Sequence, residues 1–216
     1  MGSDPTGSDP TGSDRTPHPL AVAITGSIGA GKSTALESFR RHGAATVSSD
    51  EIVHHLLKSD SDVKRALVGR FGEEILGDDG APDRQRIALR VFRDRKALDW
   101  LERLLHPLVS REYLTWRDQL AELPNPPRVT VTEVPLLFEV GAESRFDKVV
   151  AITAPRKLRE ARRGGSADDR EARLIPDHEK MKRADYAYTN TGTPDELDAW
   201  VQALMETLAE ENDAPE

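Results

Sequence analysis

The sequence has no cysteine, and this absence removes several classes of chemistry at once. Disulfide bonds, thiolate nucleophiles and cysteine-based zinc sites are all excluded. No apolar stretch approaches the roughly 18 residues that a membrane-spanning helix requires, and the N-terminus lacks the charged and then apolar pattern of a signal peptide. We therefore expect a cytoplasmic protein that does not act at a membrane.

An excess of basic residues is missing as well. The 216 residues include 30 Lys and Arg against 38 Asp and Glu, which gives a formal net charge of −8. A general nucleic-acid binder needs the opposite balance, so we expect no nucleic-acid partner. A local basic site for phosphates is still compatible with this composition. The length suits one α/β domain with an inserted segment, or one domain with tails.

Apolar residues are also scarce, at 37% of the chain, partly because both ends are polar. Residues 1–19 contain Gly-Ser-Asp-Pro-Thr twice and then Gly-Ser-Asp-Arg-Thr. Such a composition cannot form a packed core, so we predict a disordered tail whose removal leaves activity intact. At the other end, an acidic tail at 210–216 is predicted to fray after a last helix that starts at Pro194.

What the sequence does contain is a phosphate-binding loop. Residues 26–33 read Gly-Ser-Ile-Gly-Ala-Gly-Lys-Ser and fit the pattern G-x-x-x-x-G-K-[ST]. An apolar run at 20–25 predicts a strand before the loop, and 34–41 predict a helix after it. Glycines let the backbone approach a phosphate, which the inward N–H groups and the positive end of the helix attract. The residues predicted to bind a nucleotide here are Gly26, Gly29, Ala30, Gly31, Lys32, Ser33 and Thr34.

Two of these residues have particular roles in such loops. Lys32 is expected to reach the β- and γ-phosphates, and the Ser33 hydroxyl is expected to bind Mg²⁺. Four of the six histidines do not add a metal site, because their spacing is not that of ligands: His54, His55, His106 and His178.

Two carboxylates stand near the ends of predicted strands. Asp50 follows a strand at 44–47 and precedes a helix, so it is either the helix N-cap or an acid facing a ligand at the carboxyl end of the sheet. Glu133 ends a strand at 128–133. It is either an ordinary strand-end charge or the acid that holds Mg²⁺ directly or through water.

The segment from 60 to 123 is almost wholly helical in pattern, with one helix ending at His106-Pro107 and the next starting there. An insert of this size between strands is typical of a substrate-binding subdomain. After a predicted strand at 148–153, the segment 156–163 is basic. It is either a solvated helix face or a mobile lid that closes over phosphates and expels water. A last short strand is predicted at 186–189.

The order of these motifs resembles the dephospho-coenzyme A kinase family over about residues 20–208. The most specific matches are Leu105-His106-Pro107-Leu108-Val109 and Val134-Pro135-Leu136-Leu137-Phe138-Glu139. The others are Ser49-Asp50-Glu51-Ile52, Phe71-Gly72, Ile75-Leu76, Asp83-Arg84, Val91-Phe92, Glu179-Lys180, Ala184-Asp185-Tyr186 and Asn190-Thr191-Gly192.

This resemblance implies an α/β, three-layer P-loop kinase fold at 20–209, in which a parallel sheet is flanked by helices. It also implies a helical insert at about 58–123 that receives dephospho-coenzyme A, and a lid at about 156–183. The implied reaction transfers the γ-phosphoryl of ATP to the ribose 3′-hydroxyl, the last step of coenzyme A synthesis.

The resemblance also implies the roles of particular residues. Asp50 would be the base and Lys32 would stabilise the transferring phosphoryl group. Ser33 and Glu133 would hold Mg²⁺, and Arg159 and Asn190 would contact the nucleotide, with Arg162 and Arg163 adding lid charge. The residues on the acceptor side would be Asp50, His106, Leu136 and Glu139. We expect a monomer or a weak oligomer.

The chain departs from the family's pattern at several positions. Ser27 replaces the second glycine of the family's loop. Ser48 replaces an aspartate that is usual two residues before the base, and His54 replaces an arginine that is usual four residues after it. The stretch from Gly164 to Lys180 is shortened, and Pro176-Asp177-His178 stands where a glutamine is usual. Two other interpretations therefore stay open, a kinase of another nucleoside or nucleotide and a non-catalytic nucleotide-binding protein.

Overall fold

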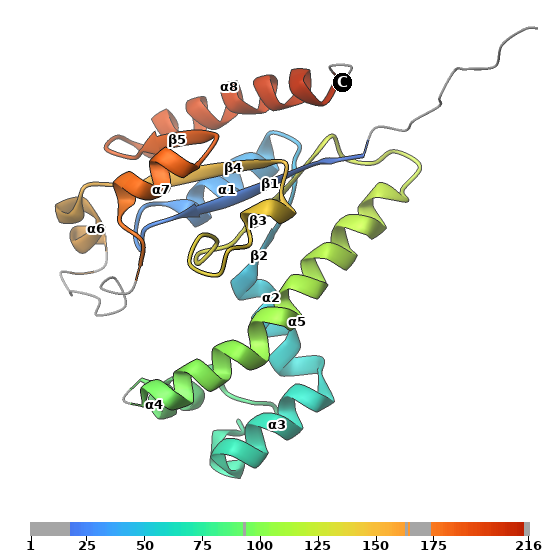
Figure 1. Ribbon diagram of the computed structural model, residues 1–216, viewed down its shortest axis with the longest axis vertical. Coiled ribbons are helices and arrows are strands. Elements are labelled where there is room, and N and C mark those ends of the chain that lie inside the picture. The colour runs from blue at the N-terminus through green and yellow to red at the C-terminus, as the bar shows by residue number, and fades with distance from the viewer. Residues whose placement is uncertain (1–17, 93, 163, 165–173, 214–216) are drawn as a thin grey trace, which may run out of the picture.

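The computed structural model describes residues 18–92, 94–162, 164 and 174–213 (Figure 1). The expectations for residues 1–17 as a disordered tail, for Arg163 and most of the shortened lid, and for 214–216 lie outside the described residues. In the part of the chain that is described, no helix is both long enough and apolar enough to cross a membrane.

A parallel sheet of five strands forms the centre of the molecule, in the order β2-β3-β1-β4-β5. The strands are β1 (Leu20–Gly26), β2 (Ala45–Ser48), β3 (Val129–Glu133), β4 (Lys148–Thr153) and β5 (Tyr186–Thr189). β1, β3 and β4 are nearly all buried, as expected for a parallel sheet that is covered on both faces. The predicted boundaries of β4 and β5 are confirmed to the residue.

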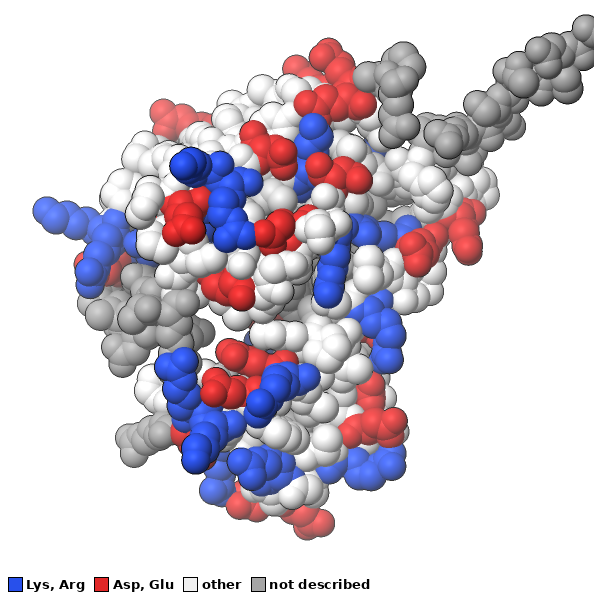
Figure 2. Space-filling model, in the orientation of Figure 1, with Lys and Arg blue, Asp and Glu red and all other residues white. Residues whose placement is uncertain are grey.

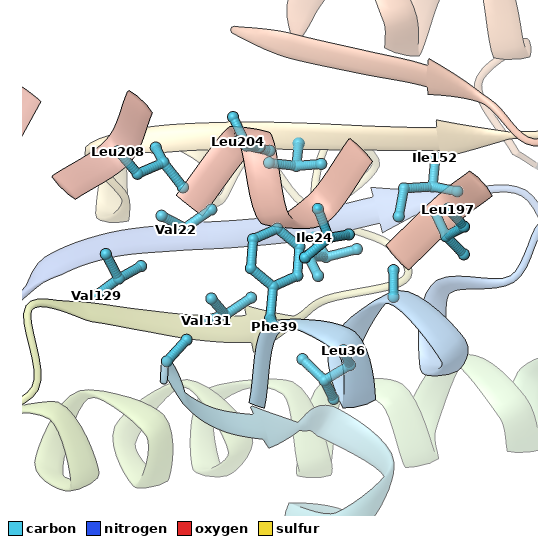
Figure 3. Close-up of a cluster of buried hydrophobic side chains, with 14 of the residues drawn as sticks. Val22, Ile24, Leu36, Phe39, Val129, Val131, Ile152, Leu197, Leu204 and Leu208 are labelled. Atoms are coloured by element: carbon cyan, nitrogen blue, oxygen red, sulfur yellow. The ribbon is translucent and has the colours of Figure 1, made fainter. Parts of the chain in front are cut away.

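Alternate side chains of the sheet belong to different hydrophobic clusters. Val22 and Ile24 of β1 pack against α1 (Lys32–Arg41) and α8 (Pro194–Asp213), with Phe39 at the centre of the cluster (Figure 3). Ala23 belongs to a second cluster, which the segment after β3 and the region of α7 (Asp177–Arg183) complete. The predicted three-layer α/β fold is confirmed, and the parallel strands place the phosphate loop at the carboxyl edge of the sheet.

The insert between β2 and β3 forms a helical unit with its own core, which lies below the sheet in Figure 1. Its buried residues include Leu67, Ile75 and Ile87. Its elements are α2 (Ser49–Ser59), α3 (Ser61–Phe71), the short 3-10 helix η1 (Glu73–Ile75), α4 (Arg84–Val91) and α5 (Arg95–Ala121). The remaining elements of the chain are the 3-10 helix η2 (Glu143–Arg145) and α6 (Arg156–Arg162).

The prediction that a helix ends at His106-Pro107 is wrong, because α5 continues through Pro107. A proline removes one backbone donor and usually kinks a helix, but packing can compensate. Here Leu105 and Val109 are both buried on either side of the proline. Leu105 packs in the core of the helical unit and Val109 in an adjoining cluster around Tyr113, so packing holds both halves and keeps the helix continuous.

Helix α8 also extends beyond Ala209, where we expected it to fray, and ends at Asp213. The Glu211 carboxylate accepts a hydrogen bond from the Tyr186 hydroxyl at 2.6 Å and pairs with Lys148 at 3.0 Å. These contacts to β4 and β5 hold the last turn against the sheet.

Candidate active site

The phosphate loop joins β1 to α1, and its glycines are required by close contacts. Gly26 has a φ of +139°, and a Cβ atom there would lie 1.8 Å from the carbonyl oxygen of Ile152. Gly31 has a φ of +101°, and its Cβ would lie 2.5 Å from Nδ2 of Asn190. Any other residue at either position would be strained and would clash. The glycines therefore let β4 and Asn190 pack directly against the backbone of the loop.

Lys32, the first residue of α1, folds back over this loop. Its Nζ donates hydrogen bonds to the carbonyl oxygens of Gly26 at 3.2 Å and Ser27 at 3.0 Å. Burial lowers the pKa of Lys32, and the nearby Glu133 carboxylate acts in the opposite direction. Burial in turn raises the pKa of Glu133, which Lys32 counteracts. The two side chains stabilise each other's charged form in a site that water reaches poorly.

A cleft of about 300 Å³ opens beside the loop, between α1, α2 and the ends of β2 and β3. It brings together three of the residues that the sequence singled out, Ser33, Asp50 and Glu133. Its other lining residues are Leu36, Glu37, Arg40, Ser48 and Glu51. The cleft thus brings the Ser33 hydroxyl, at the end of the phosphate loop, together with the carboxylates of Asp50 and Glu133.

Asp50 does not cap its helix. The N-cap of α2 is Ser48, whose hydroxyl accepts from the Glu51 N–H at 3.0 Å while the Glu51 carboxylate accepts from the Ser48 N–H at 2.9 Å. The N-cap interpretation of Asp50 is therefore wrong, because this reciprocal capping box satisfies the helix start without it. Asp50 is left 79% exposed, and its Oδ1 lies 3.3 Å from a guanidinium nitrogen of Arg84 on α4.

Residues that follow β4 and β5 contact the backbone of the phosphate loop. Asn190 is buried and donates to the carbonyl oxygen of Ala30 at 2.8 Å. Arg162 of α6 lies 3.3 Å from the same oxygen and 3.4 Å from Oδ1 of Asn190. Asn190 and Arg162 thus contact the backbone of the loop and hold its shape.

A second contact ties the loop to the root of the expected lid. The hydroxyl of Ser27 donates to the Asp177 carboxylate at the start of α7, and that carboxylate pairs with Arg159 of α6 at 3.6 Å. Ser27 and Asp177 are two of the positions at which the chain departs from the pattern of the family it resembles. The structure shows that these two departures contact each other, although 150 residues separate them.

The structure does not bring every predicted residue to the cleft. His106, in the middle of α5, and Leu136, after β3, are outside the set that lines it. Glu139 pairs with the fully buried Lys180 of α7 at 2.8 Å and accepts from the Ile175 N–H at 3.0 Å. The expected roles of His106, Leu136 and Glu139 toward an acceptor stay predictions. The pairing of Glu139 with Lys180 could not be predicted from the sequence. The two residues lie 41 positions apart, and no local pattern indicates that they meet.

We expect the change Lys180→Met to lower the free energy of unfolding by about 3 kcal/mol, since removing one partner of a buried ion pair leaves an uncompensated charge. Urea denaturation followed by circular dichroism measures this value. Lys182→Met is the matched control, because Lys182 lies on the same helix but is exposed. Equal stability of the two variants would show that the Glu139–Lys180 pair contributes nothing.

The parallel sheet, the loop with its lysine and the adjoining acidic cleft define the chain as a P-loop kinase. More particularly, the chain belongs to the dephospho-CoA kinase family, whose family model matches residues 20–196.

Similar proteins support this assignment over most of the chain. A dephospho-CoA kinase of Aquifex aeolicus is 33% identical over 193 residues, which cover 87% of this chain and 96% of that protein. A dephospho-CoA kinase of Lactobacillus johnsonii is 35% identical over 195 residues, with 87% and 97% covered. Two solved structures are similar in fold. A protein from Thermus thermophilus has a TM-score of 0.69 at 34% identity, with 89% of this chain and 98% of that one covered. The dephospho-CoA kinase from Campylobacter jejuni has a TM-score of 0.67 at 25% identity, with the same coverage.

Proposed function

We propose that this protein transfers the γ-phosphoryl group of ATP to the ribose 3′-hydroxyl of dephospho-CoA and so forms CoA. The observation that carries the proposal is the cleft in which the phosphate loop and an exposed carboxylate face the same space. The family relationship supplies the identity of the acceptor. The chain covers nearly the full length of its relatives, so the comparison concerns the whole catalytic unit.

The nucleotide side of the reaction is assigned to the loop. Backbone N–H groups of residues 26–34 bind the phosphates of ATP, and Lys32 stabilises the charge that develops on the transferred group. Among the described residues, no group of three or more histidine or acidic side chains could hold a metal ion. Mg²⁺ in kinases takes most of its oxygens from phosphates and water, so the Ser33 hydroxyl and the Glu133 carboxylate are a sufficient protein contribution. When bound, Mg²⁺ neutralises phosphate charge.

The acceptor side is assigned to Asp50. Its carboxylate accepts the proton of the 3′-hydroxyl while that oxygen forms its bond to the γ-phosphorus and the bond to the ADP oxygen breaks. Arg84 holds the carboxylate in place before the acceptor enters. Arg159, Arg162 and Asn190 keep the loop in its binding shape, and we propose that the segment 156–183 excludes water that would otherwise hydrolyse ATP.

We also propose the domain limits, the location in the cell and the oligomeric state. The helical insert at 58–123 receives the acceptor, and the catalytic unit comprises residues 20–209. The protein acts in the cytoplasm as a monomer or weak oligomer and needs no nucleic-acid partner.

The test is to measure ADP release from purified protein with Mg²⁺ and ATP, with and without dephospho-CoA, while CoA is followed by mass spectrometry. ADP and CoA that appear together would establish the reaction and the acceptor. ADP without CoA would overturn the acceptor and favour another nucleoside or nucleotide. Bound ATP without turnover would favour a non-catalytic nucleotide-binding protein.

A further inference from the structure

Helix α4 has a side that does not pack against the core of the helical unit. Ile87 and Val91 face inward and are buried. Arg84, Ala88 and Phe92 are exposed and follow one another at intervals of four residues, so they form a slanted row that starts at the edge of the buried side and turns away from it. Leu89 neighbours Phe92, three residues before it on the helix. Leu89 and Phe92 are 77% and 76% exposed, more than any other large apolar residue in the described part of the chain.

The arginines of α4 differ in what they contact. Arg90 pairs with Glu74 at 2.7 Å, and Arg86 donates to the carbonyl oxygen of Leu76, so both bind within the helical unit. Arg84 instead reaches Asp50 at the start of α2, which lines the catalytic cleft. Figure 2 shows Lys and Arg gathered over the lower left of the molecule, where Figure 1 places α4. A cationic group at the cleft is thus followed along the helix by an exposed apolar surface.

We infer that the exposed row from Arg84 to Phe92, with the adjoining Leu89, binds the acceptor, with Arg84 at its pyrophosphate and Leu89 and Phe92 at its pantetheine arm. The inference rests on the proposed function, since it takes dephospho-CoA as the acceptor. The order of groups agrees with the chemistry of that molecule. Its reacting ribose lies at Asp50, the anionic pyrophosphate comes next at Arg84, and the uncharged arm follows toward Phe92, about 12 Å farther along at 1.5 Å per residue.

The pairing of Arg84 with Asp50 is suited to an exchange of partners. Both side chains are well exposed, at 49% and 79%, and an exposed pair of this kind adds little stability. A pyrophosphate offers more than one charged acceptor oxygen, which the planar guanidinium of Arg84 can contact with two N–H groups at once. Arrival of the acceptor would thus release the Asp50 carboxylate for the 3′-hydroxyl. On the apolar side, the arm covers surface of Leu89 and Phe92 that water otherwise contacts.

The experiment compares Arg84→Gln and the double variant Leu89→Ala/Phe92→Ala with matched controls. Arg90→Gln removes an equally exposed arginine of the same helix, and Leu123→Ala removes an exposed leucine at the end of α5. We expect both test variants to raise the KM for dephospho-CoA about tenfold, the effect of losing one good contact. The KM for ATP and the melting temperature should stay near those of the wild type. Both controls should behave as the wild type.

A competitor separates the two parts of the surface. ADP-ribose carries the adenosine and the pyrophosphate but no pantetheine arm. Its inhibition constant against dephospho-CoA should rise in Arg84→Gln and stay unchanged in Leu89→Ala/Phe92→Ala. An unchanged KM for dephospho-CoA in both variants would overturn the inference, and so would equal effects in the controls. Failure of the wild type to convert dephospho-CoA would instead overturn the proposed function itself, so the two failures are distinguishable.

Discussion

Replacing Lys32 with methionine should lower kcat/KM for ATP by about a thousandfold or more, the scale for losing one group that stabilises transition-state charge. The structure holds this lysine in a fixed place at the phosphate loop. The Nζ atom is fixed by two carbonyl oxygens of the phosphate loop and lies in a buried position beside Glu133. Steady-state phosphotransfer at saturating dephospho-CoA measures the effect.

The control for this prediction is Lys64→Met, which removes an exposed lysine on α3 and leaves the net charge equal to that of the Lys32 variant. It should keep the activity of the wild type. The Lys32 variant should still show the far-ultraviolet circular dichroism of the folded protein, because α1 and the sheet are held by the cluster around Phe39. Activity within tenfold of the wild type would show that Lys32 is not the group that stabilises the transferred phosphoryl.

Replacing Asp50 with asparagine should lower kcat by about a hundredfold or more, as expected for the loss of a positioned base. ATP should bind as before, because Asp50 does not contact the phosphate loop in any hydrogen bond of the structure's described residues. Stability should change little, since Ser48 and Glu51 cap α2 without Asp50. Single-turnover phosphotransfer together with calorimetric ATP binding separates these effects.

Asp62→Asn provides a close control. Asp62 is the second residue of α3, as Asp50 is of α2, and in both helices a serine comes before the aspartate. The two substitutions therefore remove the same favourable charge from the first turn of a helix. If both leave turnover unchanged, Asp50 acts at most on the position of other groups and is not the base.

Much of the fold could be predicted from local pattern. The strands at 148–153 and 186–189 were predicted to the residue, the first because a buried parallel strand is a short apolar run with clear ends and the second because its two tyrosines alternate with other residues as in an edge strand. The predicted helix end at Pro107 was wrong. The tendency of proline to end a helix can be seen in the local sequence, but the packing of Leu105 and Val109 that overcomes this tendency cannot. The same limit explains Asp50, whose place at a helix start suggested a cap that Ser48 already provides.

The candidate site shows the same division. Ser33, Asp50 and Glu133 could be named in advance, since strand ends and a glycine loop indicate where a parallel sheet collects ligands. Arg84 and Asp177 could not be named in these roles. Each acts through a contact with a residue far away in the chain, and the pairing depends on how whole helices pack.

The sequence by itself determined the phosphate loop, the strand and helix that flank it, and the class of chemistry. These features depend on contiguous residues and on the backbone conformations that those residues allow. The tertiary structure decided which charges meet. It set Arg84 against Asp50, Asp177 against Ser27, and Lys180 against Glu139. The physical reason is that burial patterns repeat along the chain and are visible in it, whereas the meeting of two charges depends on the relative placement of elements that fold together only at the end.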